Sequence, residues 1–177
     1  MLFADGFEEI EAITITDVLR RAEIVVTTVG VGSREVTGSH AIPLITDVEL
    51  GQAVHEDWDM VILPGGLPGA TTLRDNSDVQ RFLRRQNESG ARLGAICAAP
   101  IALGAAGLLE GKRVTSYPGF EDQLVGAHYC EEAVARDGKV ITSRGVGTAL
   151  EFSLEIVADL KGRDVAQKLR ESMLIGR

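Results

Sequence analysis

The chain has 177 residues, 45% of them hydrophobic, and a net charge of −8 from 18 basic and 26 acidic residues. This size and apolar content predict one globular domain over residues 1–177 and exclude a disordered chain. The negative charge, with no basic stripe, argues against a nucleic-acid partner and against binding to an anionic membrane surface. Two cysteines are too few for a disulfide framework, and no apolar run is long enough to cross a membrane. No signal peptide is visible at the N-terminus, so we expect a cytoplasmic protein.

Short apolar runs alternate with helical patterns along the whole chain. In the first half we predict, in order, a strand at 1–4, a helix at 7–22, a strand at 24–29, a small hairpin within 30–38, a strand at 41–45, a helical turn within 47–54, a strand at 60–63 and a partial helix at 67–74. In the second half we predict a helix at 78–88, a strand-to-helix turn within 92–103, a strand at 114–117, a short helix at 120–126, a hairpin of 133–135 with 139–142, a turn at 145–148 and helices at 149–161 and 164–173. This alternation, with several wholly apolar strands, predicts an α/β fold with a mostly parallel sheet and helices on both faces.

The stretch RLGAICAAPIAL at 92–103 joins an apolar run to a helical pattern, with Cys97 at the join. Its neighbours Ala95, Ala98 and Ala99 are small, as the sharp turn of a nucleophile elbow requires. At the start of a helix a thiolate is stabilised by unpaired N–H groups and by the helix dipole. An inert buried cysteine is an equally good interpretation of this stretch alone, because Ala95 and Ala99 stand where Gly-x-Ser-x-Gly elbows carry glycine.

Further candidate groups follow the predicted strands, because ligands of such folds bind beyond the carboxyl ends of the strands. Glu11 lies on an apolar stripe of the first helix, so we expect a raised pKa and a role as acid or base beside Cys97. Glu8 lies on a similar stripe, but its place in the first turn already explains it. His128 is the natural third member of the site, since a cysteine nucleophile commonly works with a distant histidine. A solvated surface histidine is the alternative.

Glycines at the same strand ends offer backbone donors. Gly65 and Gly66 can form an oxyanion site beside Cys97, or simply a tight turn. Gly145 opens a helical segment and is a fair anion site. The chain has no phosphate-binding loop, dinucleotide fingerprint or zinc-type Cys/His spacing, so we expect neither a cofactor nor a metal.

Five segments together resemble the ThiJ/PfpI superfamily, in the branch of the Parkinsonism-associated protein deglycase. They are DGFEEIE at 5–11, LPGG at 63–66, AICAAP at 95–100, GAHY at 126–129 and TSRGVGT at 142–148. The resemblance implies a flavodoxin-like three-layer sandwich with a cysteine nucleophile elbow, and a homodimer. The site residues it implies are the redox-sensitive nucleophile Cys97, its protonated partner Glu11, the nearby His128, the backbone donors Gly65, Gly66 and Ala98, and the candidate substrate contacts Arg144 and Gly145.

The same resemblance implies a cofactor-independent glyoxalase that converts methylglyoxal to lactate, or a deglycase of early glycation adducts, in defence against carbonyl and oxidative stress. The alternative is a cysteine-based redox sensor or redox-regulated chaperone with little catalysis. Ala98 stands where the protease-like branch has a histidine, which argues against a protease. A glutaminase-type amidotransferase shares the elbow, but its late His-x-Glu pair is missing. The first strand is shorter than the family's, so we expect either a truly shortened strand or a misassigned start.

Overall fold

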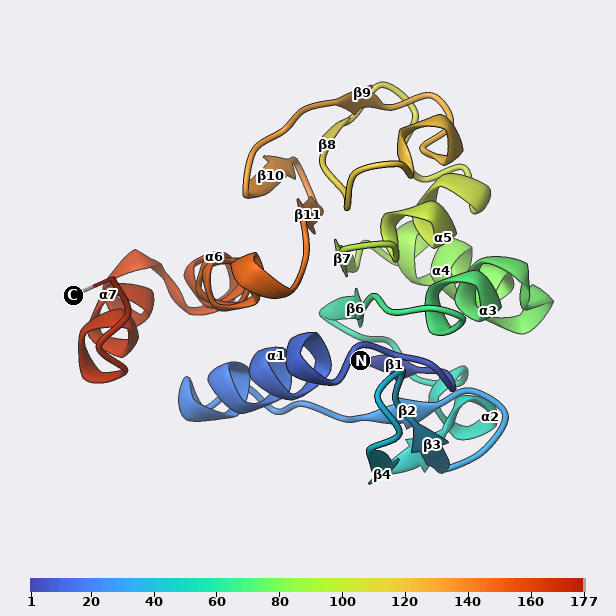
Figure 1. Ribbon diagram of the computed structural model, residues 1–177, viewed down its shortest axis with the longest axis horizontal. Coiled ribbons are helices and arrows are strands. Elements are labelled where there is room, and N and C mark those ends of the chain that lie inside the picture. Colours follow the sequence, from blue (N-terminus) through green and yellow to red (C-terminus); the bar gives the residue numbers. More distant parts are fainter. Residues whose placement is uncertain (177) are drawn as a thin grey trace.

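The computed structural model describes residues 1–176 and has three layers, with strands in the middle and helices on both sides (Figure 1). On one side of the middle layer, β1 (Leu2–Phe3) pairs in parallel with β2 (Val29–Gly30), and β2 with β5 (Val48–Glu49). The other strands run in the order β10-β11-β7-β6, and β1 lies next to β6. Their bounds are β6 Met60–Leu63, β7 Arg92–Ile96, β10 Val134–Asp137 and β11 Val140–Ser143. Only β10 is antiparallel among the neighbours in these two sheets, which confirms the predicted mostly parallel α/β fold.

The buried strands contribute side chains to two hydrophobic cores, one on each face of the middle layer. Side chains alternate along a strand, so Leu93 and Ala95 of β7 enter one core while Ile96 enters the other. Val61 and Ile62 of β6 divide in the same way. This two-sided burial explains why these strands are continuously apolar.

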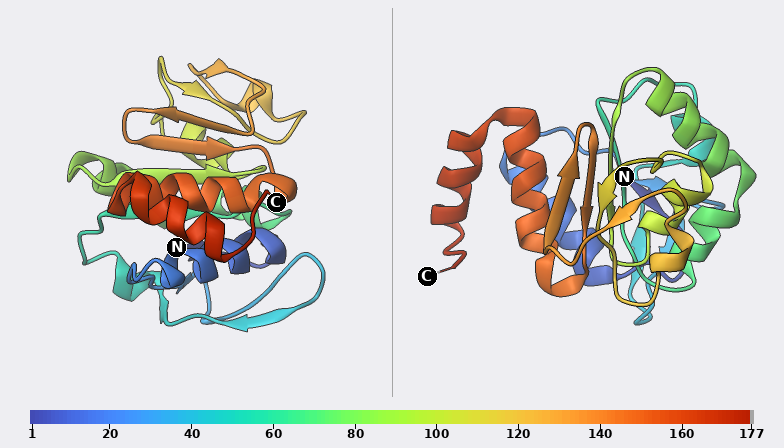
Figure 2. Two further views of the ribbon diagram at one scale, coloured as in Figure 1. Left: turned by 90° about the vertical axis from the view of Figure 1, so that its left-hand side faces the viewer. Right: turned by 90° about the horizontal axis from the view of Figure 1, so that it is seen from above.

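Helices cover the two cores separately (Figure 2). One face is covered by α1 (Glu9–Arg21), α6 (Ala149–Lys161) and the outermost helix α7 (Arg163–Ser172). The other face is covered by α2 (Leu50–Ala53), α3 (Gly69–Asp75), α4 (Ser77–Glu88) and α5 (Pro100–Ala105). The α4 helix begins where the sequence indicates, because Asn76 accepts hydrogen bonds from the N–H groups of Asp78 and Val79.

Two small pairs of strands lie outside the main layers. In the first, β3 (Glu35–Thr37) and β4 (Pro43–Ile45) form an antiparallel hairpin. In the second, β8 (Arg113–Val114) and β9 (His128–Tyr129) are parallel, and the short 3-10 helix η1 (Glu121–Gln123) lies in the connection between them. A further 3-10 turn, η2 (Val146–Thr148), leads into α6.

Several predicted elements are shorter than expected, among them those at 24–29, 114–117 and 120–126. The run 24–29 forms a strand only at Val29, because β1 offers a partner to β2 across just Leu2–Phe3. The strand predicted at 114–117 is Arg113–Val114, and the helix predicted at 120–126 contracts to η1. In each case the residue types favour the predicted state, but neighbouring strands or turns do not extend it.

None of the helices within residues 1–176 combines the length and the apolar character that crossing a membrane requires.

Candidate active site

Cys97 lies in a tight turn between β7 and α5, as predicted for a nucleophile elbow. Its φ of 61° is in the left-handed region that residues other than glycine rarely adopt. Hydrogen bonds on both sides hold this conformation, since the N–H of Cys97 donates to the carbonyl oxygen of Ser143 at 2.9 Å and its own carbonyl oxygen accepts from the N–H of Tyr117 at 2.9 Å. Such strain costs about 1–3 kcal/mol and persists only where the surroundings impose it. The turn therefore presents the thiol at the carboxyl edge of the sheet, where it is half-buried.

Glu11 comes to this thiol from the first turn of α1. Its side chain has no exposed surface, and its carboxyl group and the Cys97 thiol are hydrogen-bonded to each other. One carboxyl oxygen, Oε2, accepts the N–H of Gly65 at 2.8 Å, while the buried Oε1 has no hydrogen-bond partner among residues 1–176. Because Glu11 lies on the apolar stripe of α1, its side chain is buried in the site, as the sequence predicts.

Burial dominates the ionisation of both groups. It raises the pKa of Glu11 to about 7, although the hydrogen bonds from Gly65 and Cys97 act in the opposite direction. Burial, together with the charge of Glu11, raises the pKa of the Cys97 thiol to about 12. The predicted raised pKa of Glu11 is confirmed. The N–H groups of Gly66 and Ala98 lower the pKa of the Cys97 thiol, as predicted for an elbow, but burial and the charge of Glu11 raise it more.

The predicted backbone N–H donors bond to two different side chains, those of Cys97 and Glu11. The N–H groups of Gly66 and Ala98 donate to the sulfur of Cys97, whereas the N–H of Gly65 donates to Glu11. Gly65 also needs to be glycine, because a Cβ there would lie 2.5 Å from the Cβ of Cys97 and 2.7 Å from Glu11 Oε2. The loop after β6 therefore serves both the nucleophile and its acid–base partner.

Gly145 lies in the site, whereas the role of Arg144 as a substrate contact stays a prediction. A Cβ on Gly145 would be 3.9 Å from Glu11 Oε1 and 3.3 Å from the ring of Tyr117. The charge of Arg144 acts on Glu121 and Tyr129, which belong to η1 and β9. Tyr117 was not predicted as a site residue. Its signal was its place at the end of the strand predicted at 114–117, at the same edge of the sheet as Cys97.

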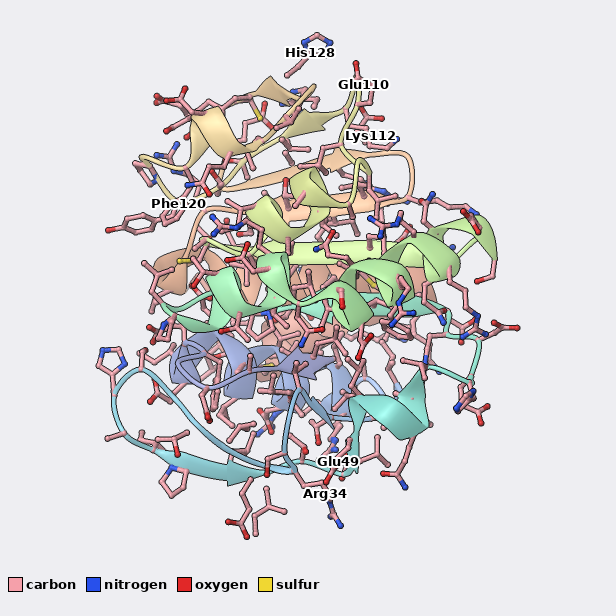
Figure 3. All side chains as sticks on the ribbon, turned by 90° about the vertical axis from the view of Figure 1, so that its right-hand side faces the viewer. Arg34, Glu49, Glu110, Lys112, Phe120 and His128 are labelled. Atoms are coloured by element: carbon pink, nitrogen blue, oxygen red, sulfur yellow. The ribbon has the colours of Figure 1, made fainter. Side chains whose placement is uncertain are left out.

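His128 does not approach Cys97, so the prediction that it lies near the thiol is wrong. It pairs with Arg113 at the start of β8, whereas Tyr117, at the far end of the same segment, contacts Cys97. Its side chain is exposed and projects outward beside Glu110 and Lys112 (Figure 3). The parallel pairing of β9 with β8 returns the chain to the amino edge of the sheet, away from the site.

Comparison with known proteins assigns the chain to a family. A profile of the DJ-1/PfpI family matches residues 1–159. The chain belongs to the DJ-1/PfpI family. It is 40% identical to Protein dj-1beta of Drosophila melanogaster over 178 residues, which are 99% of this chain and 95% of that protein. The crystal structure of that protein matches with a TM-score of 0.95 over 99% of this chain and 96% of that chain.

Two other relatives of this DJ-1/PfpI chain bear on its chemistry. One is the glutathione-independent glyoxalase DJR-1.2 of Caenorhabditis elegans, which is 34% identical over 179 residues, 100% of this chain and 95% of that protein. The other is the DJ-1 of Toxoplasma gondii, whose oxidized form has been solved. It has a TM-score of 0.94 at 32% identity, over 99% of this chain and 97% of that chain.

Within residues 1–176, one group of side chains has atoms close enough together to share a metal ion, namely Glu8, Glu9 and His40. Their atoms already bond one another. Glu9 Oε1 accepts the N–H of His40 at 2.7 Å, and Glu9 Oε2 lies 2.9 Å from His40 Nδ1. The carboxyl group of Glu9 thus fastens the segment after β3 to the start of α1.

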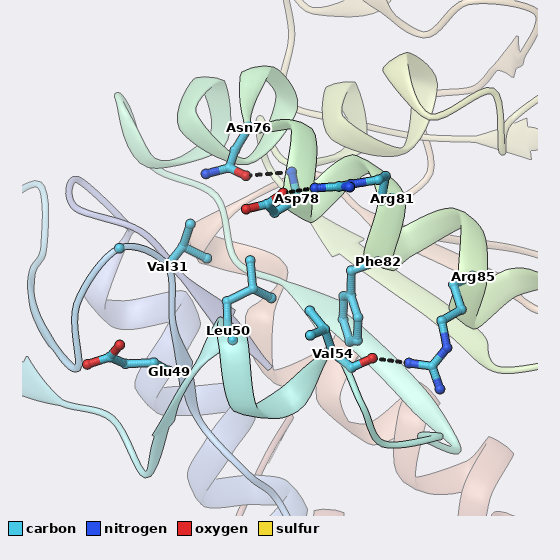
Figure 4. A pocket seen from close by; sticks show the side chains of 11 residues that line it. Val31, Glu49, Leu50, Val54, Asn76, Asp78, Arg81, Phe82 and Arg85 are labelled. Atoms are coloured by element: carbon cyan, nitrogen blue, oxygen red, sulfur yellow. Dashed lines mark hydrogen bonds and ion pairs between the residues drawn. The ribbon is translucent and has the colours of Figure 1, made fainter.

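A cavity of about 640 Å³ lies between α2 and α4 (Figure 4). Its floor is apolar, with Leu50 and Phe82, and no residue of the Cys97 site lines it. The charged groups at its rim are already engaged, because Arg81 pairs with Asp78, and Arg85 donates to the carbonyl oxygen of Val54. This cavity is therefore separate from the Cys97 site.

Proposed function

We propose that this protein is a cofactor-independent glyoxalase or deglycase, which converts methylglyoxal, free or released from early glycation adducts, to lactate. The observation that carries the proposal is the buried pair of Cys97 and Glu11. A thiol whose pKa is about 12 needs a base as it attacks, and the carboxyl group bonded to it has a pKa near 7. A base with that pKa is well matched to neutral conditions. The glyoxalase name of the nematode relative supports the same chemistry.

In the first step the sulfur of Cys97 adds to the aldehyde carbon and the carbonyl π bond opens. The thiol proton passes to Glu11, and the new alkoxide then takes that proton from Glu11 to give a hemithioacetal, which leaves Glu11 ionised for the next step. The N–H groups of Gly66 and Ala98, which already donate to the sulfur, stabilise negative charge as the bond forms.

In the second step Glu11 moves protons between the two substrate carbons. Glu11 removes the proton from C1, and the C2 carbonyl oxygen takes up a proton from solvent, which gives an enediol. Glu11 then delivers its proton to C2, and the hydroxyl group on C1 releases its proton to solvent as the thioester carbonyl forms. The aldehyde carbon is oxidised and the ketone carbon is reduced, so no external redox partner is needed. The product is a lactyl thioester on Cys97, and water hydrolyses it to lactate and the free thiol.

A lactate assay with matched variants tests this proposal. We expect Cys97→Ser to lose at least about a thousandfold in kcat/KM with methylglyoxal, and Glu11→Gln to lose about 10²–10⁴-fold. Cys130→Ser, which changes the other free cysteine, should keep the wild-type rate. Lactate production by Cys97→Ser at the wild-type rate would refute the proposal.

A second candidate is a redox sensor or redox-regulated chaperone in which Cys97 is oxidised by peroxide. Two equivalents of peroxide convert the thiol through sulfenic to sulfinic acid, and each releases one water. The solved oxidized form of the Toxoplasma relative and the half-buried thiol beside Glu11 support it. Mass spectrometry after mild peroxide distinguishes the cysteines. The idea fails if Cys130 gains oxygen while Cys97 stays reduced.

The proposed partners are a small aldehyde or glycated substrate and a second copy of the chain. Exposed isoleucines on α1 and on the β3–β4 hairpin, Ile13 and Ile45 among them, support self-association. The free cysteines suit a reducing compartment, so we place the protein in the cytoplasm.

A further inference from the structure

Tyr117 is held beside the nucleophile by the backbone. Its N–H donates to the carbonyl oxygen of Cys97 at 2.9 Å, so its position is coupled to the strained elbow. Tyr117 is 52% exposed, and the one aromatic pair within residues 1–176 is the edge-to-face contact of Phe3 with Phe7. The Tyr117 ring is therefore a large apolar surface at the site that the core does not use.

The two oxygens of Glu11 determine on which side of the site a substrate lies. Oε2 is occupied by the N–H of Gly65, whereas Oε1 is buried and has no partner within residues 1–176. A buried carboxyl oxygen without a partner is costly, and a bound molecule with a polar atom at that place would satisfy it. Substrate atoms that exchange protons with Glu11 therefore approach through Oε1.

Glu11 Oε1 lies near the point where a Cβ of residue 145 would stand, which the glycine leaves unfilled. A Cβ on Gly145 would lie 3.9 Å from Oε1, 3.3 Å from Tyr117 Cδ2 and 3.9 Å from Tyr117 Cε2. The Cβ position of Gly145 is thus close to both the unpartnered Oε1 of Glu11 and the Tyr117 ring. A substrate bonded to Cys97 and placed at Oε1 has its next substituent directed at the Tyr117 ring.

We propose that Tyr117 is a specificity-determining residue, whose ring forms an aromatic wall that selects 2-oxoaldehydes with a flat aromatic substituent over methylglyoxal. The inference rests on the proposed function for its substrate class. Flat rings gain from offset or edge-to-face contact with the Tyr117 ring, and a methyl group does not.

The first test compares kcat/KM for phenylglyoxal, assayed as mandelate, with kcat/KM for methylglyoxal, assayed as lactate. Tyr117→Ala should lower the ratio of the two values about two- to tenfold, the size of one aromatic contact. Tyr117→Phe keeps the ring and should keep the ratio. A loss in the Phe variant equal to that in the Ala variant, or an unchanged ratio in Tyr117→Ala, would overturn the inference.

The second test separates this inference from the glyoxalase proposal, because it needs no turnover. In a Cys130→Ser background, the remaining thiol is alkylated with phenacyl bromide or with bromoacetone. The sulfur of Cys97 bonds to the carbon that carries bromine, bromide leaves, and the thiol proton passes to Glu11 or solvent. We expect the ratio of the two alkylation rates to fall in Tyr117→Ala and to be unchanged in His128→Ala, which alters an exposed residue away from the site.

The two tests then give separate answers. If wild type forms neither lactate nor mandelate but Tyr117→Ala still lowers the alkylation ratio, the proposed function fails and the aromatic wall stands. If wild type forms both products and neither ratio responds to Tyr117→Ala, the aromatic wall fails and the proposed function stands.

Discussion

Glu11 is a fully buried carboxyl group, and its ionisation is coupled to folding. Its pKa is about 7 in the folded protein, against 4.5 for an unperturbed glutamate. Between these values the folded state binds more protons than the unfolded chain, so stability falls as the pH rises. The contribution of Glu11 is fully present below pH 4.5 and is lost as the pH passes 7.

Replacing Glu11 with glutamine should remove this dependence. Glutamine resembles the neutral carboxyl group and does not ionise, so we expect Glu11→Gln to be more stable than wild type above pH 7 by up to about 3 kcal/mol, since each pH unit between the two pKa values is worth about 1.4 kcal/mol. Urea denaturation at pH 5, 6, 7 and 8 measures the difference. Asp17→Asn, at an exposed position on the same helix, serves as the control. A constant difference between wild type and Glu11→Gln across this range would contradict the assignment.

The residues of the site differ in how well their positions could be predicted from the sequence. Glu11 was predictable because a carboxyl group on an apolar stripe must enter the core. The small residues around Cys97 are compatible with a nucleophile elbow but equally with an inert buried cysteine, and only the resemblance of five segments to a known family decided between them. The raised pKa of Cys97 depends on burial and on the charge of Glu11, which no local pattern encodes. His128 was misplaced because the pairing of β9 with β8, which is not evident from spacing, decides at which edge of the sheet it lies.

At the scale of elements, the loop after β6 is the most constrained part of the site. A methyl group on Gly65 would lie 2.5 Å from the Cβ of Cys97 and 3.0 Å from its sulfur, so the two must separate. We expect Gly65→Ala to lower kcat/KM at least about a hundredfold, because a shift of about 1 Å has that effect on a reacting group. Gly51→Ala is the matched control, since nothing lies within 4 Å of a Cβ there. Wild-type turnover by Gly65→Ala would show that this loop does not position the nucleophile.

The carboxylate of Glu9 accepts several of the hydrogen bonds that attach the loop of the β3–β4 hairpin to the start of α1. Burial works against the charge of Glu9, but hydrogen bonds from the side chain and backbone of His40 and from the backbone of Ile42 lower its pKa to about 2. The unfolded value is 4.5, so this stabilisation is present above pH 4.5 and is lost as the pH falls toward 2.

Glu9→Gln should therefore loosen the hairpin at neutral pH. We expect a loss of about 1–2 kcal/mol at pH 7, as for the loss of hydrogen bonds to a charged group, and faster hydrogen exchange over residues 37–42. The difference from wild type should shrink steadily from pH 5 to pH 3. Glu35→Gln, an exposed position on the same hairpin, should leave exchange unchanged. Equal exchange in wild type and Glu9→Gln would contradict the attachment.

Elements differ in how well their bounds can be predicted from the sequence, because some depend on a local pattern and others on a distant partner. The strand β6 and the helix α6 have the predicted bounds, because a wholly apolar run and a strong helical periodicity each fit one environment. The β-branched run at 24–28 lacks a strand because a strand also needs a partner, and the pairing of β2 with β1 covers only two residues. Attachment of the hairpin by Glu9 and His40 left no local signal, since the two residues are far apart in the chain.

At the scale of the whole molecule, an apolar face extends from α1 to the β3–β4 hairpin. Ile10 and Ile13 on α1 are 56% and 48% exposed, and Ile42 and Ile45 of the hairpin region are 56% and 69% exposed. Ile13 and Ile45 line one shared hollow of about 270 Å³, so the helix and the hairpin form a continuous surface. A contiguous apolar patch of this kind on a soluble protein commonly marks an interface.

If a second copy covers this face, each substitution acts twice, because a two-fold interface presents the same patch from both subunits. We expect wild type to have twice the chain mass of 18.9 kDa in light scattering after gel filtration, and Ile13→Lys or Ile45→Lys to weaken the dimer at least about a hundredfold by burying an unpaired charge. Val25→Lys, at a residue that is 94% exposed on another part of the surface, should leave the dimer intact. A wild-type mass of 18.9 kDa at micromolar concentration would exclude the dimer. Dissociation by Val25→Lys but not by Ile13→Lys would place the interface elsewhere.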